Sequence, residues 1–289
     1  MTTMTRRSIQ SVHSAHRDDI GDLVTRRPVP GPGLPQIDPF LFLNHHGPQT
    51  YPPGNGGLPF GPHPHRGFET VTFVIEGSLA HHDTGGGTSV VGPGGVQWMT
   101  AGRGLIHAEL SPDAFKKDGG PLEILQLWVN LPARLKMTDP DYHEVPAREI
   151  SVFELAEGVT FRAVSGTESA PVRSLTGVTV GLIDMAAGST AELSVPAGRN
   201  PLFYTVRGSV EANGSRIEPY QLVRFADDGD TIAVHSADGC LILFGHAEPL
   251  DEPVVAHGPF VMNSQEEIAE AVRAYQRGEF GDPRALARG

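Results

Sequence analysis

The chain has 289 residues, a length that suits two domains better than one small domain. Its 22 basic and 34 acidic side chains give a net charge of −12, which disfavours direct binding of nucleic acid. The single cysteine, Cys240, excludes an intrachain disulfide. No apolar segment follows Arg6 and Arg7, and no stretch is long enough to span a bilayer, so we expect a cytoplasmic protein without membrane partners.

The first half of the chain, after a proline-rich stretch from Pro28 to Pro35, alternates short apolar runs with turn residues. No helical period covers this region, and several runs show the two-residue alternation of strands. Many short strands of this kind are typical of a sandwich or barrel. The predicted strands are Phe40–Leu43, Phe68–Ile75, Ser78–Asp83, Thr88–Val91, Val96–Thr100, Leu105–Leu110 and Leu122–Leu131.

A second strand-rich region, from about Val152 to Phe244, echoes the first. The run from Phe203 to Ser209 repeats the pattern of the run from Val71 to Ser78, with a strand followed by a Gly-Ser turn. We therefore predict two copies of one barrel, over residues 1–135 and 136–289. The second copy has no His-x-His motif before its turn, which indicates that it lacks the site described below.

The C-terminal region has the signature of one helix. Ser264 and Glu267 form a capping box, and Ile268, Val272 and Tyr275 follow at helical spacing. Gly278 can end the helix in a left-handed conformation. We expect this helix to pack on a barrel, in an otherwise all-β protein.

Two histidines, His63 and His65, lie in the run Pro62 to Glu69, where the prolines favour an extended backbone. Residues at i and i+2 of an extended chain point the same way, so both imidazoles can bind one ion. Imidazole is a ligand that suits Fe, Cu, Ni or Zn. The alternative is a pair of loop histidines in a turn rich in proline and glycine.

A second pair, His107 and Glu109, follows a Gly-x-Gly turn in the run Gln97 to Glu109. The two share one strand face, whereas Ile106 and Ala108 point to the other. Unpaired polar groups on the inner face of a barrel are costly, and a metal ion shared with the first pair removes that cost. The alternative is an edge strand that faces solvent.

These two runs resemble the metal motifs of the cupin superfamily, and in detail those of the pirin family. Asp38-Pro39-Phe40, His82-Asp83 and the second barrel with its C-terminal helix also fit, so the resemblance covers nearly the whole chain. It implies a bicupin fold of two jelly-roll-like, cupin-type barrels, with one iron-type site in the N-terminal barrel. The family's metal ligands would be His63, His65, His107 and Glu109.

Other residues are candidates for the surroundings of this site. Glu69 has the spacing from His65 of the carboxylate ligand in ordinary cupins; we place it behind the ligands, with direct ligation as the alternative. Phe68, Trp98 and Met99 are candidate pocket walls, although core packing explains each equally well. His45 can line the mouth of the pocket, with a surface position as the alternative.

Four ligands leave two positions open on an octahedral ion, which is the geometry of a catalytic site. Fe(II) is the expected ion; Mn, Ni, Co, Cu or Zn also fit such ligands. The resemblance implies quercetin 2,3-dioxygenase activity, in which oxygen opens the ring of a flavonol-like aromatic substrate and Glu109 acts as the base. The alternatives are a regulatory protein whose iron state controls binding to a protein partner, and a metal-stabilised barrel without turnover.

Overall fold

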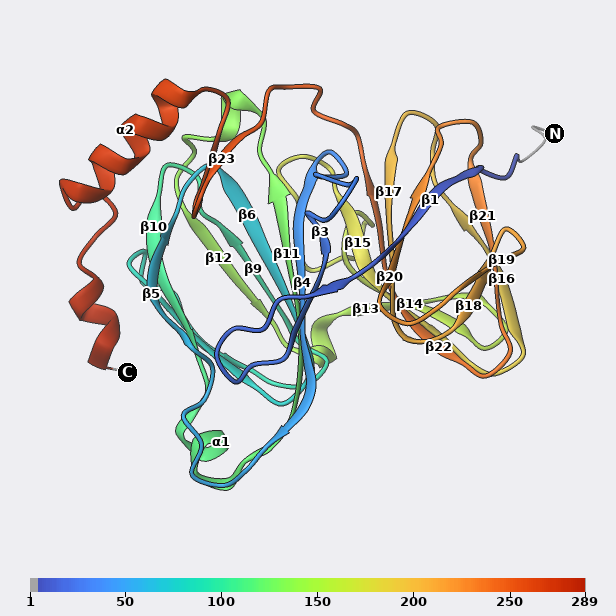
Figure 1. Cartoon of the computed structure of the whole chain (residues 1–289), viewed down its shortest axis with the longest axis horizontal. Coiled ribbons are helices and arrows are strands. Elements are labelled where there is room, and N and C mark those ends of the chain that lie inside the picture. Colours follow the sequence, from blue (N-terminus) through green and yellow to red (C-terminus); the bar gives the residue numbers. More distant parts are fainter. Residues whose placement is uncertain (1–4, 289) are drawn as a thin grey trace. The chain divides into compact units, whose positions relative to one another are not determined.

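The computed structural model describes residues 5–288, which form mainly antiparallel β-strands (Figure 1). Residues 1–4 and 289, at the outer ends of the two predicted domains, lie outside the described residues. Contacts group the chain into two compact units. The histidine unit comprises Arg17–Arg26, Leu41–Arg148 and the described part of Leu250–Gly289; the apolar unit comprises the described part of Met1–His16, with Arg27–Phe40 and Glu149–Pro249.

The histidine unit is built around a seven-stranded sheet, in the order β12-β9-β6-β11-β4-β3-β2, and a four-stranded sheet, in the order β5-β10-β7-β8. Its core contains Val74 and Ile124 of the large sheet and Leu79 and Val91 of the small one, so it lies between the two sheets. The strands are β2 (His16–Arg17), β3 (Thr25–Val29), β4 (Phe40–Tyr51), β5 (Phe60–His65), β6 (Phe68–Glu76), β7 (Leu79–Asp83), β8 (Thr88–Val91), β9 (Val96–Thr100), β10 (Leu105–Leu110), β11 (Gly120–Asn130) and β12 (Asp141–Val145).

The apolar unit repeats this plan, with a seven-stranded sheet in the order β1-β20-β17-β22-β15-β14-β13 and a four-stranded sheet in the order β16-β21-β18-β19. The predicted repeat is confirmed, because β17 lies between β20 and β22 as β6 lies between β9 and β11. The strands are β1 (Ile9–Ser14), β13 (Ser151–Ala156), β14 (Val159–Ser165), β15 (Thr179–Met185), β16 (Ser189–Ser194), β17 (Asn200–Gly208), β18 (Val210–Ala212), β19 (Ser215–Ile217), β20 (Gln221–Phe225), β21 (Thr231–Ser236) and β22 (Cys240–Ala247).

The predicted C-terminal helix is α2 (Gln265–Gln276), and its capping box is present: Ser264 Oγ accepts from the Glu267 amide at 3.2 Å, and Glu267 Oε2 accepts from the Ser264 amide at 3.0 Å. The helix follows the hairpin β23 (Val255–His257) and β24 (Phe260–Met262). The remaining short helices are α1 (Asp113–Asp118), η1 (Ala133–Leu135), η2 (Ala147–Glu149) and η3 (Pro283–Arg288). No helix among the described residues is long and apolar enough to cross a membrane.

Helix α2 packs within the histidine unit (Figure 1). Its buried residues Ile268, Ala271 and Ala274 join a cluster with Phe260 of β24 and Ile106 of β10. Ile106 therefore points away from the side of β10 that carries His107, as the alternation of strand side chains requires. The contacts thus group the helix with residues 41–148, because its apolar face covers β10. The predicted division had placed the helix with residues 136–289.

Gly67 occupies a position that only glycine fits. Its φ is +91°, and a Cβ added there would lie 2.0 Å from the Val261 carbonyl oxygen. Gly67→Ala is expected to lower the free energy of unfolding by about 3 kcal/mol, from backbone strain together with the steric contact. Gly21→Ala is the matched control, because Gly21 has φ +63° but no atom within 4 Å of an added Cβ, and it is expected to cost about 1 kcal/mol. Urea unfolding of both variants measures this; equal losses would contradict it.

Candidate metal centre

Three imidazoles meet between strands β5 and β10. The ligand atoms of His63, His65 and His107 all lie within 4.8 Å of one another. The two strands pair antiparallel with His107 opposite His63, so the two histidines on β5 share the face that carries His107. The Nε2 atoms of His63 and His107 are 2.9 Å apart. The structure thus brings together the three histidines of the two sequence motifs.

Backbone carbonyls orient two of these rings. His63 Nδ1 lies 2.8 Å from the Gly61 carbonyl oxygen, and His65 Nδ1 lies 3.3 Å from that of Pro259. A carbonyl can only accept, so each Nδ1 donates its hydrogen and each Nε2 keeps its lone pair. Such hydrogen bonds behind a metal-binding imidazole fix its tautomer and ring orientation. Two rings therefore direct a lone pair at the cluster.

Burial keeps two of the three histidines, His65 and His107, uncharged. His65 is 3% exposed and His107 is fully buried, whereas His63 is half-buried. Burial, reinforced by the neighbouring histidines, lowers the pKa of His65 to about 3 and that of His107 well below its usual value. Neutral imidazole is the form that binds metal, so no proton has to leave these two rings at neutral pH.

Glu109 is buried on the same strand, but its carboxylate lies outside the group of three imidazoles. Hydrogen bonds from other strands hold it: Oε1 accepts from Gln97 Nε2 and, at 3.2 Å, from Thr72 Oγ1, while Oε2 accepts from Gln126 Nε2 at 2.6 Å. Tyr142 donates to Gln97 Oε1 at 3.2 Å, which directs the amide nitrogen of Gln97 at Glu109. Each oxygen of the carboxylate thereby has at least one hydrogen-bond donor in its present position.

A narrow cavity, without room for a water molecule, lies beside Glu109. Thr72 and Gln126 contribute polar groups to its wall. The other lining residues are His46, Phe60, Leu79 and Ile124, so the cavity is largely apolar apart from the groups that bind Glu109.

Aromatic rings form a wall beside His65. Phe68, a predicted wall residue, lies 5.1 Å from the His65 ring, and Trp128 lies 5.3 Å from it. Phe42 stacks on Trp128 at 4.6 Å. Trp128 and Phe42 were not predicted from the sequence to lie near the site. Trp128 could have been found from the alternation in Leu122–Leu131, because Gln126 and Trp128 share the strand face opposite the apolar residues of that run.

Glu69 and Trp98 lie on the other side of the large sheet. Glu69 accepts from Thr100 Oγ1 at 2.7 Å, and its position on β6 is opposite in face to Thr72, which binds Glu109. Burial raises the pKa of Glu69 despite that hydrogen bond. Trp98 pairs with Val71, on the Glu69 face, whereas Met99 pairs with Thr70, on the Thr72 face. Of these three predicted surroundings, Met99 alone shares the face of the site.

His45 and its neighbour His46 lie on opposite faces of β4. His45 is fully buried, and its Nε2 lies 2.8 Å from Glu123 Oε1. His46 points to the opposite face of β4, lines the Glu109 cavity and lies 2.9 Å from Thr25 Oγ1 through its Nδ1. The histidine that borders the site from this strand is therefore His46.

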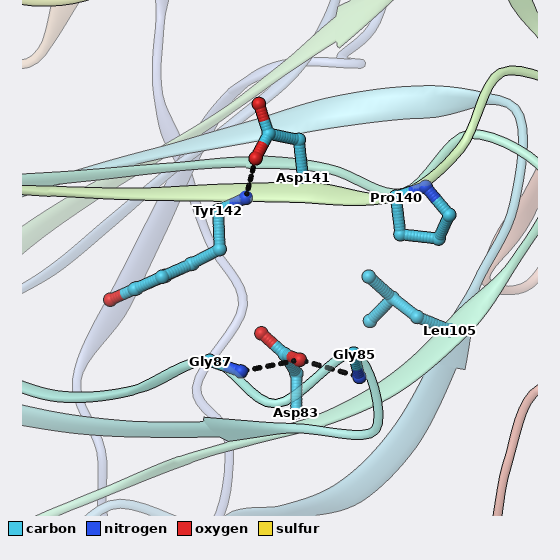
Figure 2. A pocket seen from close by; sticks show the side chains of 7 residues that line it. All are labelled: Asp83, Gly85, Gly87, Leu105, Pro140, Asp141 and Tyr142. Atoms are coloured by element: carbon cyan, nitrogen blue, oxygen red, sulfur yellow. Dashed lines mark hydrogen bonds between the residues drawn. The ribbon is translucent and has the colours of Figure 1, made fainter.

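A second cavity, of about 210 Å³, lies beside Asp83 and Tyr142 (Figure 2). Figure 2 shows the Asp83 carboxylate on its floor, where it accepts from the amides of Gly85 and Gly87 at 2.7 and 3.0 Å. Asp83 also pairs with His81 at 2.8 Å, and the His81 ring stacks on Tyr142 and lies 5.4 Å from the His107 ring. The remaining lining residues are Leu105, Pro140 and Asp141. The hydrogen-bonded pair of Asp83 and His81 thus lies next to the His107 imidazole of the cluster.

Comparisons with known proteins agree with this geometry. The Pirin family profile matches residues 22–129, and the Pirin C-terminal cupin domain profile matches residues 182–281. A Pseudomonas aeruginosa protein named provisionally as a quercetin 2,3-dioxygenase is 36% identical over 84% of this chain and 87% of its own. Human Pirin is 37% identical over 90% of this chain and 89% of its own. The crystal structure of quercetin 2,3-dioxygenase from Acinetobacter baumannii is 31% identical and superposes with a TM-score of 0.91 over 96% of this chain and all of that one.

Two repeated β-domains, with a histidine cluster in one of them, define a bicupin. The chain belongs to the pirin family. The expected resemblance and fold class are therefore confirmed.

The described residues fit a single metal ion. Three imidazoles converge, two of them with the Nδ1 atom committed to a carbonyl, and the Nδ1 of His107 has no hydrogen-bond partner among the described atoms. Nitrogen ligands of this kind accept several divalent transition metals, so the donor set fits the ion without selecting it.

The buried histidines also predict how the metal-free protein responds to acid. The folded-state pKa of His65 is lowered, so its contribution to stability is present above pH 6.5 and is lost as the pH falls toward 3. For this one residue we expect a loss of about 2 kcal/mol between pH 7 and pH 5. His65→Gln should remove that part of the slope in chelator-treated protein, measured by urea unfolding at both pH values. An unchanged slope would contradict the assignment.

Proposed function

We propose that this protein is a mononuclear metal-dependent dioxygenase that opens the ring of a flavonol-like substrate. The observation that supports this most directly is the convergence of three imidazoles from β5 and β10, of which burial keeps those of His65 and His107 uncharged. We propose Fe(II) as the ion, with Mn, Ni, Co, Cu or Zn as alternatives. The relatives named as quercetin 2,3-dioxygenases support the substrate class.

The metal, when bound, would polarise a substrate hydroxyl and lower its pKa. His63, His65 and His107 would hold it. The half-buried His63 lies where the cluster reaches solvent, so substrate would enter on that side. The rings of Phe68 and Trp128 beside His65 would pack against an aromatic substrate and exclude water.

Glu109 would take the proton of the substrate hydroxyl, either as a fourth ligand with one free oxygen or from its present position. Gln97 and Gln126 hold its two oxygens and set its orientation. Glu109 would have to move toward the imidazoles if it acts as a ligand, because the present carboxylate lies outside the cluster.

The test is anaerobic reconstitution with Fe(II), followed by oxygen uptake and carbon monoxide release with quercetin. His63→Ala and His107→Ala are expected to bind iron at least about tenfold more weakly, because each removes a ligand. Glu109→Gln is expected to lower kcat/KM by about 10² to 10⁴, the usual contribution of a general base. His82→Ala is the matched control, since His82 lies on β7 outside the cluster, and it should retain iron and activity.

Wild-type protein that binds iron yet consumes no oxygen with quercetin would contradict the proposed activity. That result is what the regulatory alternative predicts, and it would direct attention to protein partners whose affinity depends on iron. Glu109→Gln with wild-type kcat/KM would instead remove Glu109 from the proposed role of base.

A further inference from the structure

Lys136 carries the most buried amino group of the histidine unit, and this group contacts the chain just after the candidate metal ligand His65. Lys136 is 1% exposed, and its Nζ donates to the carbonyl oxygens of Gly67 and Val261 at 2.8 and 3.0 Å and to Asn130 Oδ1 at 2.6 Å. Burial lowers its pKa to about 8, so the ammonium form still predominates at neutral pH. An ammonium has three N–H donors, and each one has an acceptor here. Lys136 therefore joins three separate segments at one point.

The first of those segments is the short connection that follows β5, and the second is the C-terminal hairpin of β23 and β24. Gly67 lies two residues after His65, and Val261 lies on β24. The segments run side by side, with the Val261 amide donating to the Arg66 carbonyl at 3.1 Å. The Pro259 carbonyl, just before β24, accepts from the Arg66 amide at 3.4 Å and from His65 Nδ1 at 3.3 Å. The position of β24 thus sets the position of the acceptor that orients His65.

The third segment is the site-facing side of β11. Asn130 shares its strand face with Trp128, whose ring lies 5.3 Å from His65. Each acceptor of Lys136 therefore belongs to a segment connected to His65: Gly67 follows it in the chain, Val261 lies on the hairpin that orients it, and Asn130 lies on the strand that carries Trp128.

We propose that Lys136 is a positioning residue for the metal ligand His65. Its three hydrogen bonds hold β24 against the chain after β5 and so fix the Pro259 carbonyl that orients the His65 imidazole. This inference rests on the metal site of the proposed function, but not on its substrate or reaction. It makes the C-terminal hairpin, nearly 200 residues downstream of His65, part of the metal centre.

The test compares metal binding with stability in two variants. Lys136→Met keeps an unbranched side chain of similar length and removes all three donors. We expect its dissociation constant for Co(II), measured by chelator competition, to rise roughly ten- to a hundredfold, as is usual when the hydrogen-bonded support of a ligand is lost. The visible absorption band of bound Co(II), which reports ligand geometry, should shift as well.

Val91→Ala is the matched control, because Val91 on β8 packs in a core cluster of the histidine unit that contains no residue of β24. It should lower the thermal midpoint while retaining the wild-type Co(II) affinity and spectrum. If Lys136→Met behaves like this control, with a lower midpoint and unchanged metal binding, Lys136 is merely structural and the inference is overturned.

Asn130→Ala keeps the proposal testable if Lys136→Met does not fold. It removes one acceptor of three and should raise the Co(II) dissociation constant several-fold with a smaller spectral shift; wild-type affinity and spectrum in this variant would overturn the inference. Failure of the proposed activity is distinguishable, because it gives wild-type Co(II) binding without oxygen uptake. Wild-type protein that binds no Co(II) through His65 would overturn both.

Discussion

The alternation of side chains along β-strands determines where every group of the metal centre lies. On β5 and β10 it directs three imidazoles to one point, and on β6, β9 and β11 it directs Thr72, Gln97 and Gln126 at Glu109. A shift of one residue in the register of any of these strands would turn its polar groups to the opposite face. The pairing of the strands is therefore the constraint on which the site depends.

The centre combines two kinds of polar group. Burial lowers the pKa of His65 and His107, so these two imidazoles stay neutral and their lone pairs remain available to a metal. Glu109, in contrast, is surrounded by amide and hydroxyl donors that hold its carboxylate in place. An imidazole of the cluster, that of His107, and a candidate base thus lie two residues apart on one strand of the histidine unit.

Local pattern was sufficient to predict the three histidines, the capping box at Ser264 and the repeated strands, because each depends on residues close together in the sequence. The partners of the site depend on contacts between distant segments. Pro259 and Lys136 could not be predicted, because nothing in their local sequence places a carbonyl or an ammonium beside β5. Trp128 and Gln126 were detectable in principle on the second face of β11, where a polar and an aromatic side chain interrupt an apolar run.

The central claim is that three imidazoles of one barrel hold one metal ion, and X-ray absorption spectroscopy of the Fe(II)-loaded protein tests it most directly. The account predicts one iron per chain, with scattering from three imidazole rings in wild type and from two in His107→Ala. A first shell without imidazole scattering, or one that His107→Ala leaves unchanged, would contradict it.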